Sequence, residues 1–578
     1  MFDVDNVLHE RFPKIQNKPW LRKPLQSTLR HLLHEDEFKA FEERFPHLKG
    51  IEFVEQVLEY FNLKIEVNQR ECERILAHGR VVIFANHPIG SLDGLALLKL
   101  VHDIRPDVRI VANDILMQLE PMHKLLLPVD NFGGKTVKEN LREIDSWLNQ
   151  EGVVIFFPAG EVSRLKPSGI KDGAWHKGFL QFAARNRAPL LPIHVKARNS
   201  AMFYGTSMLY KPLSTLLLVQ EMFNLEDGKI KLTIGEQIPF DSYQATQHLP
   251  LKMRVKLLYK HLYRVGKGKS SLFQTEASIA HPESRTVLRK ALEESEKLGE
   301  TPDGKTIWLY SSSEDSPVLR EIGRLREVAF RAVGEGTGRR RDLDKFDQHY
   351  WHLILWDPDE QEIVGAYRFA DTAKLMKEFG EDAIYTCSLF YFDREMEPYL
   401  EKGLELGRSF VQPRYWGRRS LDYLWFGIGA FLAKNPQYRY LFGPVTISNA
   451  LPDTAKALLI YFYNLYFPSQ KPLAASKRPF RLSEDQVYEL TSHFTGNDYS
   501  RDFKKLKHLL DNLGCAIPTL YKQYAELCDP SGVQFIDFNV DPDFADCIDG
   551  LVLVDIHTLK PQKRDRYIRV HEDAGQSA

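Results

Sequence analysis

The chain has 578 residues, of which 43% are hydrophobic and 27% are charged, a length that exceeds one core and a composition that excludes wholesale disorder. Its 77 Lys and Arg residues balance 78 Asp and Glu residues, so no overall positive field indicates a nucleic-acid partner. Five cysteines without a CxxC pair favour a reducing compartment over a disulfide framework. We therefore expect at least two globular domains and no nucleic-acid partner.

Residues 1–75 are predicted to form a helical region, because apolar residues recur at helical spacing in residues 51–63. Basic residues among the first fifty make this region a candidate contact for anionic lipid, although a solvated helix face explains them equally well. The N-terminus lacks the basic start and apolar core of a signal peptide, and no apolar run approaches the roughly 18–20 residues of a membrane-spanning helix. The pattern predicts a protein that can lie on a membrane without crossing it.

Residues 76–264 alternate short apolar runs with helical patterns, which is typical of an α/β sheet with helices packed on it. The predicted helices include residues 137–148, 178–185 and 249–263. The predicted strands are Val81–Ala85, Val108–Ala112, Leu125–Val129, Val153–Phe157, Leu190–Val195 and Lys229–Ile238.

Residues 265–303 begin with a stretch rich in Gly, Ser and Lys and continue as a charged helical pattern, so they are predicted to form a linker and a helix. Residues 304–578 show a second α/β pattern with a C-terminal extension. Its predicted strands are Ile307–Tyr310, Trp351–Trp356, Ile363–Phe369, Tyr385–Tyr391, Gly407–Gln412, Tyr440–Ile447, Val533–Phe538 and Leu551–Ile556.

A histidine and an aspartate follow the first predicted strand of residues 76–264. His87 comes shortly after Val81–Ala85, and Asp93 follows with five residues between them. Ligands are handled at the C-terminal ends of strands in open α/β sheets, and an imidazole oriented by a carboxylate is a general base for a hydroxyl. A strand-end histidine followed by Asp93 as a helix N-cap explains the same spacing, so the motif alone leaves both interpretations open.

A second block, residues 153–164, again runs from a strand into a turn, and residues 189–195 form a late strand that contains proline. Together with the His and Asp motif, these blocks resemble the glycerolipid (lysophosphatidic-acid type) acyltransferase family over residues 70–240. The resemblance implies that His87 is the catalytic base and Asp93 its partner. It implies an acceptor pocket that includes Phe157, Pro158, Gly160, Glu161, Ser163 and Arg164.

Two features differ from that family's pattern. The family has four residues between its His and Asp, so the five found here require a looser turn, which Pro88 and Gly90 permit. In the second block Ala159 and Val162 replace a Glu and the Arg that contacts phosphate. Unless Arg164 substitutes for that Arg, the acceptor is expected to lack a phosphate.

Charged motifs also mark residues 304–578. Arg side chains and backbone N–H groups near a helix N-terminus suit an anionic donor, and carboxylates in a pocket suit a cationic amine and help to deprotonate it. Each motif alone is equally typical of a solvated loop or a surface ion pair. The residues are Arg326, Phe330, Asp344, Asp347, Arg368, Glu405 and Arg408.

In this order the motifs resemble the GNAT-type acyltransferase fold and, within it, the acyl-homoserine-lactone synthases. Residues 333–338 and 441–445 are similar to the ornithine N-acyltransferases of bacterial aminolipid synthesis. The resemblance implies that Glu405 is catalytic and handles the amine. The other six motif residues would then bind the substrates, with the carboxylates at the amine and the arginines at the donor or the amino-acid carboxylate.

The donor implied by this resemblance is an acyl thioester on acyl carrier protein, with coenzyme A as the alternative carrier. Acyl carrier protein is acidic, and the basic run Arg339–Arg341 is a candidate docking site, although a solvated charge run explains it too. Arg414, Arg418 and Arg419 precede a predicted helix and are the candidate donor-binding residues. A thioester is already activated, and no His and Cys cluster has zinc spacing, so we expect neither a metal nor a tightly bound cofactor.

An O-acyltransferase-like half and an N-acyltransferase-like half in one chain resemble the bifunctional ornithine lipid synthases. The fold class is therefore expected to be α/β, with two acyltransferase domains of which the second is a GNAT-like mixed sheet. The resemblance implies N-acylation of ornithine with a 3-hydroxyacyl group, then O-acylation of the new hydroxyl, by a peripheral protein at the cytoplasmic face of the inner membrane. Three alternatives remain open: a lysophosphatidic acid acyltransferase with an inactive second half, a synthase of exported acyl-amino acids, and a non-enzymatic membrane-binding protein.

Overall fold

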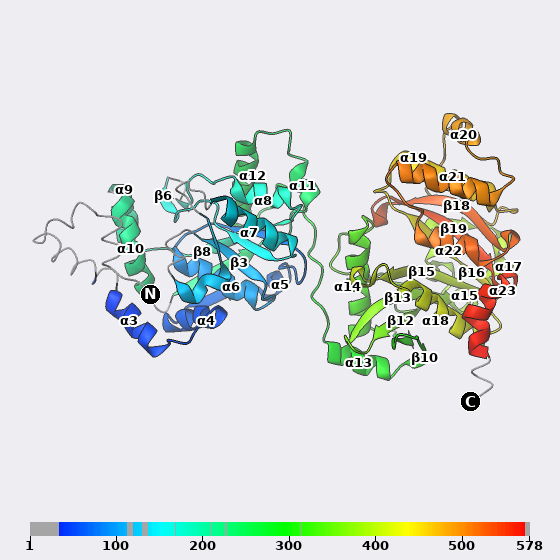
Figure 1. Ribbon diagram of the computed structural model, residues 1–578, viewed down its shortest axis with the longest axis horizontal. Coiled ribbons are helices and arrows are strands. Elements are labelled where there is room, and N and C mark those ends of the chain that lie inside the picture. Colours follow the sequence, from blue (N-terminus) through cyan, green and yellow to red (C-terminus); the bar gives the residue numbers. More distant parts are fainter. Residues whose placement is uncertain are drawn as a thin grey trace, which may run out of the picture. The chain divides into compact units, whose positions relative to one another are not determined.

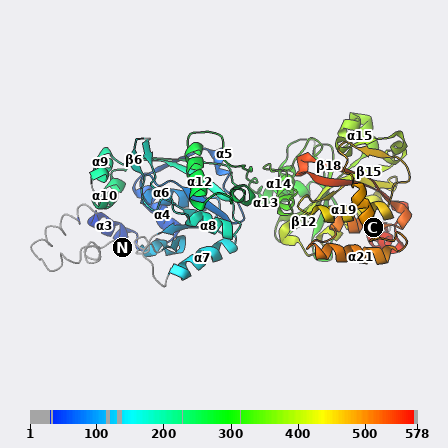
Figure 2. The same ribbon diagram turned by 90° about the horizontal axis from the view of Figure 1, so that it is seen from above.

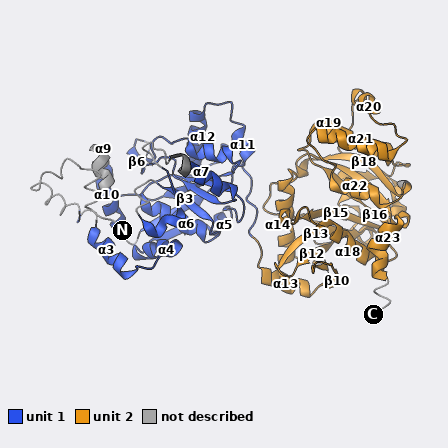
Figure 3. Cartoon of the chain, viewed as in Figure 1, with its two compact units in different colours: residues 1–281 blue, residues 282–578 orange. Residues whose placement is uncertain are grey.

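The computed structural model describes residues 30, 34–112, 119–129, 137–167, 169–209, 211–225, 228–312 and 314–572. The chain forms two compact units, residues 1–281 and 282–578 (Figure 3). The expected linker divides between them, and part of it is structured. Residues 285–293 form a helix and residues 296–300 form an edge strand of the second unit.

A seven-stranded sheet forms the centre of unit 1, with the order β1-β9-β8-β2-β5-β3-β4. All neighbouring strands are parallel except the antiparallel pair β8 and β9. The strands are β1 (Lys64–Val67), β2 (Val81–Ala85), β3 (Val108–Ala112), β4 (Leu126–Pro128), β5 (Val153–Phe156), β8 (Leu190–Lys196) and β9 (Lys229–Ile234), and β6 (Arg164–Lys166) and β7 (Gly169–Lys171) form a separate hairpin.

Helices cover both faces of this sheet (Figure 1). Alternate residues of β2 enter two different cores: Val81, Ile83 and Ala85 pack with α4 and α6, whereas Val82 and Phe84 pack with α7, α8 and α12. Both faces of the central strands are therefore buried, which explains their unbroken apolar runs. The helices are α3 (Glu35–Arg44), α4 (Ile51–Tyr60), α5 (Gln69–Cys72), α6 (Ser91–His102), α7 (Val137–Asn149), α8 (Gly178–Arg185), α9 (Ala201–Leu209), α10 (Lys211–Phe223), α11 (Phe240–Gln244) and α12 (Leu251–Val265).

The prediction of a wholly helical region over residues 1–75 is wrong at its end. Lys64–Val67 alternates polar and apolar side chains with period two and forms the edge strand β1, parallel to β9. The first 29 residues lie outside the described part, so the candidate lipid contact there has no structural account. Among the described residues, no helix combines the length and the hydropathy that crossing a membrane requires.

An eight-stranded mixed sheet forms unit 2, with the order β10-β11-β12-β13-β15-β16-β19-β18. Every neighbouring pair is antiparallel except β15 and β16. The strands are β10 (Glu296–Glu300), β11 (Thr306–Tyr310), β12 (Trp351–Asp357), β13 (Glu362–Asp371), β15 (Gly403–Val411), β16 (Tyr440–Ile447), β18 (Val533–Asp541) and β19 (Cys547–Asp555), and β14 (Phe390–Phe392) pairs separately with β17 (Ala474–Ser476).

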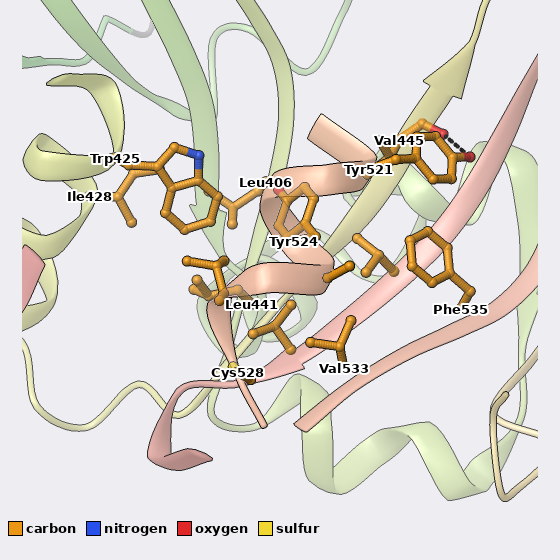
Figure 4. Packing of buried hydrophobic residues seen from close by; sticks show 14 of the residues in the cluster. Leu406, Trp425, Ile428, Leu441, Val445, Tyr521, Tyr524, Cys528, Val533 and Phe535 are labelled. Carbon is orange, nitrogen blue, oxygen red and sulfur yellow. Dashed lines mark hydrogen bonds between the residues drawn. The ribbon is translucent and has the colours of Figure 1, made fainter. Parts of the chain in front are cut away.

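The two faces of this sheet carry different helices, and Figure 2 shows α15 and α21 on opposite sides of β15 and β18. One face packs on the large aromatic core of α18, α19, α21 and α22, in which Trp425, Tyr521 and Tyr524 lie together (Figure 4). The other face packs on α14 at one end and on α15–α17 at the other. The helices are α13 (Arg285–Glu293), α14 (Pro317–Ala332), α15 (Thr372–Phe379), α16 (Thr386–Leu389), α17 (Glu397–Leu400), α18 (Ser420–Lys434), α19 (Asp453–Tyr466), α20 (Glu484–Thr491), α21 (Tyr499–Asn512), α22 (Thr519–Leu527) and α23 (Pro561–Arg564).

The strand predicted at residues 385–391 is also wrong. Residues 386–389 form the short helix α16, and only residues 390–392 form a strand, β14. The N-terminal N–H groups of this segment bond to the buried Glu405 carboxylate rather than to a neighbouring strand. A distant side chain therefore overrides the local β propensity of this segment.

The ladder between β15 and β16 stops after Glu405 and Phe442, although both strands continue. Beyond that point β15 pairs only with β13, up to Val411, and β16 pairs only with β19, up to Ile447. Arg408 lies in the separated part of β15 with a φ of 48°, an uncommon conformation for a residue with a side chain. The two strands thus form a divided edge in the middle of the sheet.

The C-terminal segment Asp565–Arg569 packs closely on α18, and Gly429 of that helix permits the close approach. A Cβ atom at Gly429 would lie 1.8 Å from the carbonyl oxygen of Tyr567. We expect Gly429→Ala to lower the free energy of unfolding of unit 2 by about 1–3 kcal/mol, because the helix and the segment must move apart. Chemical denaturation of the full chain measures this change.

Gly299→Ala is the matched control, because nothing lies within 4 Å of the Cβ position at Gly299. We expect its unfolding midpoint to match that of the unmodified chain. Equal midpoints for the two glycine variants would contradict the close packing of the C-terminal segment.

Candidate active sites

The turn that holds His87 is fixed by the residue before it. Asn86 follows β2, donates from its side-chain amide to the carbonyl oxygen of Val195 at 2.8 Å, and accepts from the N–H of Val195 at 2.8 Å. These two bonds join the end of β2 to β8, and the Asn86 side chain replaces the main-chain pairing that would continue the sheet there. His87 is thereby held at the carboxyl end of the central strands.

Asp93 reaches His87 because the helix begins after a glycine. Gly90 has a φ of 99° and precedes α6, which places Asp93 in the first turn of that helix. Oδ2 of Asp93 accepts the N–H groups of Ile89 at 2.9 Å and Gly90 at 3.2 Å, and lies 3.3 Å from Nδ1 of His87. The five-residue spacing therefore brings the two side chains into contact.

Burial shapes the electrostatics of this pair. The Asp93 side chain is fully buried, and burial raises its pKa while the contact with His87 opposes that shift. The His87 ring is partly exposed and stacks on the ring of Phe157, with 4.2 Å between centroids. Asp93 and Phe157 thus fix the plane of the imidazole, and Nδ1 faces the carboxylate.

The imidazole forms part of the wall of an apolar cavity of about 500 Å³. Helices α3, α4, α6, α8 and α10 contribute to its lining, which is dominated by aliphatic and aromatic side chains. Its size is in the range of small-molecule binding pockets, and its character suits a hydrocarbon chain. Representative lining residues are Phe41, Phe53, Leu95, Leu98, Phe157 and Phe179.

Asp172 joins the two sequence blocks of unit 1, and sequence reasoning did not single it out. Its side chain accepts from the hydroxyl of Ser163 at 2.5 Å, from the N–H of His87 at 3.2 Å and from Nε1 of Trp175 at 2.8 Å. Ser163 in turn donates its N–H to the carbonyl oxygen of His87 at 2.7 Å. Ser163 is therefore a buried connector between the blocks, whereas an acceptor-pocket role was expected for it.

The other predicted pocket residues divide into two groups. Phe157, Pro158 and Gly160 line the cavity beside His87. Glu161 and Arg164 lie 4.0 Å apart, and the Arg164 guanidinium lies over the ring of Phe203 at 5.3 Å.

In unit 2, Glu405 is buried and surrounded by hydrogen-bond donors. Its carboxylate accepts from the hydroxyl of Tyr350, from the N–H of Thr386 at 2.6 Å and its hydroxyl at 2.5 Å, and from the N–H of Tyr385 at 3.2 Å. Burial raises the pKa of Glu405, and the bonds from Thr386 and Tyr350 oppose that shift. The carboxylate fixes the positions of Tyr350 and Tyr385, neither of which the sequence motifs identified as a site residue.

Arg326 and Arg368 share the carboxylate of Asp347. Nη1 of Arg326 lies 2.7 Å from Oδ1 of Asp347, and Nη1 of Arg368 lies 3.0 Å from the same atom and 2.6 Å from Asp344. Burial alone would raise the pKa of Asp347, but the two guanidinium groups hold it well below its usual range. His352 contacts the same group, and burial lowers its pKa to about 4, so it is neutral at pH 7.

Arg408 faces both carboxylates and aromatic rings. Its Nε lies 3.4 Å from Asp342, and its guanidinium lies over the rings of Tyr385 at 4.9 Å and Phe544 at 4.8 Å. Phe544 packs edge-on against the predicted substrate residue Phe330, with 5.1 Å between centroids. The structure thus brings all seven predicted motif residues, Phe330 among them, together with Asp342 and Tyr385, to one face of the sheet between α14 and α15–α17. We call this group of nine residues the polar pocket.

Several buried polar atoms of the polar pocket have no hydrogen-bond partner among the described residues. They are Nε and Nη2 of Arg368, Nε of Arg408, and one carboxylate oxygen each of Asp342 and Asp344. Buried polar groups without partners cost about 1–3 kcal/mol each, so these atoms need a water, an ion or a ligand as a partner. A zwitterion, with a carboxylate for the guanidinium N–H groups and an ammonium for the carboxylates, matches this pattern.

The candidate donor-binding arginines lie around the start of α18. Arg414 pairs with Glu362 at 2.7 Å and Glu360 at 3.1 Å, Arg419 lies 3.4 Å from Asp422, and the Arg418 guanidinium lies over the ring of Tyr415. Arg414 and Arg418 therefore share the ring of Tyr415, whereas Arg419 pairs with Asp422. The divided edge between β15 and β16 offers unpaired main chain nearby, to which an amide-containing arm can bond.

The basic run Arg339–Arg341 follows α14. Arg341 pairs with Glu283 at 3.3 Å, and the carbonyl oxygen of Arg339 accepts from Arg331 at 2.6 Å. Among the residues that the structure describes, no group of three or more His, Cys, Asp or Glu side chains has the arrangement of a metal site.

Comparison with known proteins identifies an acyltransferase in each unit. The family model described as "Acyltransferase" matches residues 7–271, and the model described as "Acetyltransferase (GNAT) domain" matches residues 325–426. The predicted fold class and the prediction that the chain is an acyltransferase are both confirmed.

Three relatives bear on the substrate. "Glycine N(alpha)-acyltransferase" of Bacteroides thetaiotaomicron is 33% identical over 51% of this chain and 92% of its own length. "Lyso-glycine lipid O-acyltransferase" of the same organism is 30% identical over 43% of this chain and 92% of its own length. "L-ornithine N(alpha)-acyltransferase" of Brucella abortus is 30% identical over 27% of this chain and 63% of its own length. The amino-acid lipid character of the predicted activity is therefore supported, whereas ornithine is associated with a shorter match than glycine.

Asp172 generates a prediction for unit 1. Asp172→Asn replaces one accepting oxygen by a donor, which leaves Ser163 or Trp175 without its bond in a buried place. We expect the free energy of unfolding of unit 1 to fall by about 1–3 kcal/mol, measured by chemical denaturation with tryptophan fluorescence. Asp103→Asn, at an exposed ion pair at the end of α6, is the control and is expected to change it by less than about 0.5 kcal/mol.

Proposed function

The chain belongs with the glycine N(alpha)-acyltransferases over one part of its length and with the lyso-glycine lipid O-acyltransferases over another, and we propose that it carries out both acylations. Unit 2 joins a 3-hydroxyacyl group to the α-amino group of an amino acid. Unit 1 then esterifies the new hydroxyl with a second acyl chain. The observation that carries the proposal is that one chain holds both a His–Asp pair in an apolar cavity and a polar pocket suited to a zwitterion.

The polar pocket supports the first acylation. The guanidinium N–H groups of Arg368 that have no partner suit the carboxylate of an amino acid, and the carboxylates on the same side of the sheet suit its ammonium group. The divided edge beside Arg408 suits the amide groups of a pantetheine arm, so the thioester carbon can approach the amine. We propose acyl carrier protein as the donor's carrier, with coenzyme A as the alternative, and Arg339–Arg341 as the docking residues.

The apolar cavity supports the second acylation. His87 lies in its wall, oriented by Asp93, and can take the proton of a hydroxyl whose acyl chain fills the cavity. The hydroxyl oxygen then attacks the thioester carbon, and the thiol leaves with the proton that His87 holds. The product of the first reaction has a long apolar chain and no phosphate, which agrees with Val162 in place of the family's phosphate-contacting Arg. We propose that the two-chain product leaves to a membrane surface.

Lipid analysis tests both reactions. In a bacterium without aminolipids, the chain is expected to produce a phosphorus-free aminolipid with two acyl chains, detected by mass spectrometry. His87→Ala should leave only the one-chain form, because the esterifying base is lost. Glu405→Gln should lower both forms at least about tenfold, because the carboxylate that positions Tyr350 and Tyr385 is lost.

His102→Ala, at the far end of α6, and Glu401→Gln, which is exposed, are the matched controls and should leave both lipids unchanged. Altered phosphatidate species with no aminolipid would contradict the proposal and favour a glycerolipid acyltransferase. Absence of any lipid change, with acyl carrier protein and amino acids present, would contradict an enzymatic role in lipid synthesis.

The acceptor is tested separately with purified chain, 3-hydroxyacyl carrier protein and competing amino acids. We take glycine as the acceptor, following the longer matches, and ornithine as its competitor. The ratio of kcat/KM values for glycine and ornithine is expected to exceed about 10, a difference that one well-matched pocket contact can supply. A ratio below one would show that ornithine is the preferred acceptor. Lysine and glutamine are measured in the same assay as further competing acceptors.

A further inference from the structure

Three carboxylates from distant parts of the chain gather at the edge of the polar pocket. Asp549 lies on β19, Asp541 at the end of β18, and Glu335 in the loop after α14. The register places Asp549 opposite Thr446 of β16 and Asn539 of β18. Two of the three therefore come from the C-terminal extension, which the sequence motifs left without a role.

Alternation along the strands puts Asp549 on the same face as the polar pocket. Leu551, two positions on from Asp549, packs in the core of α15–α17, as do Ala370 and Phe442. On β13, Arg368 stands two positions before Ala370, and its neighbours Tyr367 and Phe369 belong to the opposite core. On β15, Glu405 is the cross-strand partner of Ala370. The side chain of Asp549 consequently belongs to the face that holds Arg368 and Glu405.

Asp549 differs from Glu405 in how its oxygens are occupied. Glu405 accepts four hydrogen bonds, from Tyr350, Tyr385 and twice from Thr386, so its lone pairs are engaged. Asp549 accepts one neutral bond, from the Thr446 hydroxyl to Oδ1 at 2.7 Å. Of these two buried carboxylates, Asp549 is the one with an oxygen available to take a proton.

Contacts of Tyr385 connect Arg368 with Asp541, which stands two positions from Asn539, the cross-strand partner of Asp549. Arg368, whose side chain is 1% exposed, has Nε and Nη2 without partners among the described residues and lies over the ring of Tyr385 at 5.2 Å. The hydroxyl of Tyr385 donates to Asp541 at 3.4 Å, and the Arg408 guanidinium also lies over the Tyr385 ring, at 4.9 Å. Asp541 and Asp549, on the same side of the sheet, are therefore candidates to receive the ammonium group of an amino acid whose carboxylate binds Arg368.

We propose that Asp549 is the general base of N-acylation and that Glu335 passes the proton on to solvent. This inference rests on the proposed function. Glu335 is partly exposed, whereas Asp549 is 2% exposed, so a proton accepted by Asp549 needs such a relay. Glu405 acts as a positioning residue, which holds Tyr385 beside the substrate.

The step balances without any further reactant. The α-ammonium group gives one proton to the Asp549 carboxylate and becomes a neutral amine. The amine nitrogen attacks the thioester carbon and forms the C–N bond, and the second proton passes from nitrogen to the sulfur as the C–S bond breaks. The products are the amide and the thiol, and the first proton leaves through Glu335.

The electrostatics agree with this role. Burial raises the pKa of Asp549 to about 7, opposed by the Thr446 bond, and burial also raises the pKa of Glu335 to about 7. A base with such a pKa is half deprotonated near pH 7 and transfers protons efficiently there. The titratable and charged groups that face Asp549 are Glu335, Tyr385, Arg408, Tyr521, Asp541 and Cys547.

The first test uses the full chain with glycine and 3-hydroxyacyl carrier protein. Asp549→Asn is expected to lower kcat about 100-fold or more, with a much smaller change in the KM for glycine. Glycine has no side-chain ammonium group, so unchanged glycine acylation by Asp549→Asn would show that Asp549 only binds a longer amino acid and would overturn the inference. The exposed Asp546→Asn is the control and should retain full activity.

The second test is the pH profile of kcat. It compares enzymes that remain active, so its interpretation does not require a variant with a large loss of activity. Activity of the unmodified chain should rise as the pH rises through about 7, because the base must be deprotonated. Thr446→Val removes the bond that stabilises the carboxylate, so this limb should move to higher pH. An unmoved limb in Thr446→Val with an otherwise active enzyme would overturn the inference.

Two readouts separate this inference from the proposed function. If the unmodified chain acylates neither glycine nor ornithine, the proposed function fails, and the inference fails with it. If the unmodified chain is active and Asp549→Asn retains its kcat, only the base assignment fails. Thermal unfolding of each variant, expected within a few degrees of the unmodified chain, identifies any variant whose loss comes from misfolding.

Discussion

The burial of charged side chains on one face of the second sheet is the constraint on which unit 2 depends. Removing an ion from water costs several kcal/mol, so Arg326 and Arg368 are stable there because Asp347 pairs with both and Asp344 pairs with Arg368. The same requirement fixes the loop that carries Asp344 and Asp347 against β13. What the protein's own groups leave unmatched, on Arg368, is then available to a substrate of complementary charge.

The two units solve opposite binding problems. The proposed reaction of unit 2 requires a site for a small, charged amino acid, and the paired ions on one face of its sheet suit such a ligand. Unit 1 must hold a long apolar chain, and it offers a cavity lined by aliphatic and aromatic side chains with His87 in the wall. The product of the first reaction has gained the acyl chain that the second site requires, which gives the two reactions a physical order.

Local sequence patterns predicted most strands of both sheets, because buried strands in such folds are apolar without interruption. The pattern failed where a distant contact decides the conformation. Residues 386–389 turn into a helix because Glu405 accepts their N–H groups, and residues 64–67 become a strand because β9 offers an edge. Neither partner is near in sequence, so no local pattern records it.

The sequence by itself determined the chemistry: His87 and Asp93 after a strand, and the Arg and carboxylate motifs of unit 2, indicated two acyltransferases. Only the tertiary structure decided which of these groups meet. The φ of Gly90 lets Asp93 reach His87 despite the unusual spacing, and Asp172 connects two blocks that the sequence separates. It also brought Asp549 to the polar pocket, because strand register, a property of paired chains, sets which side chains share a face.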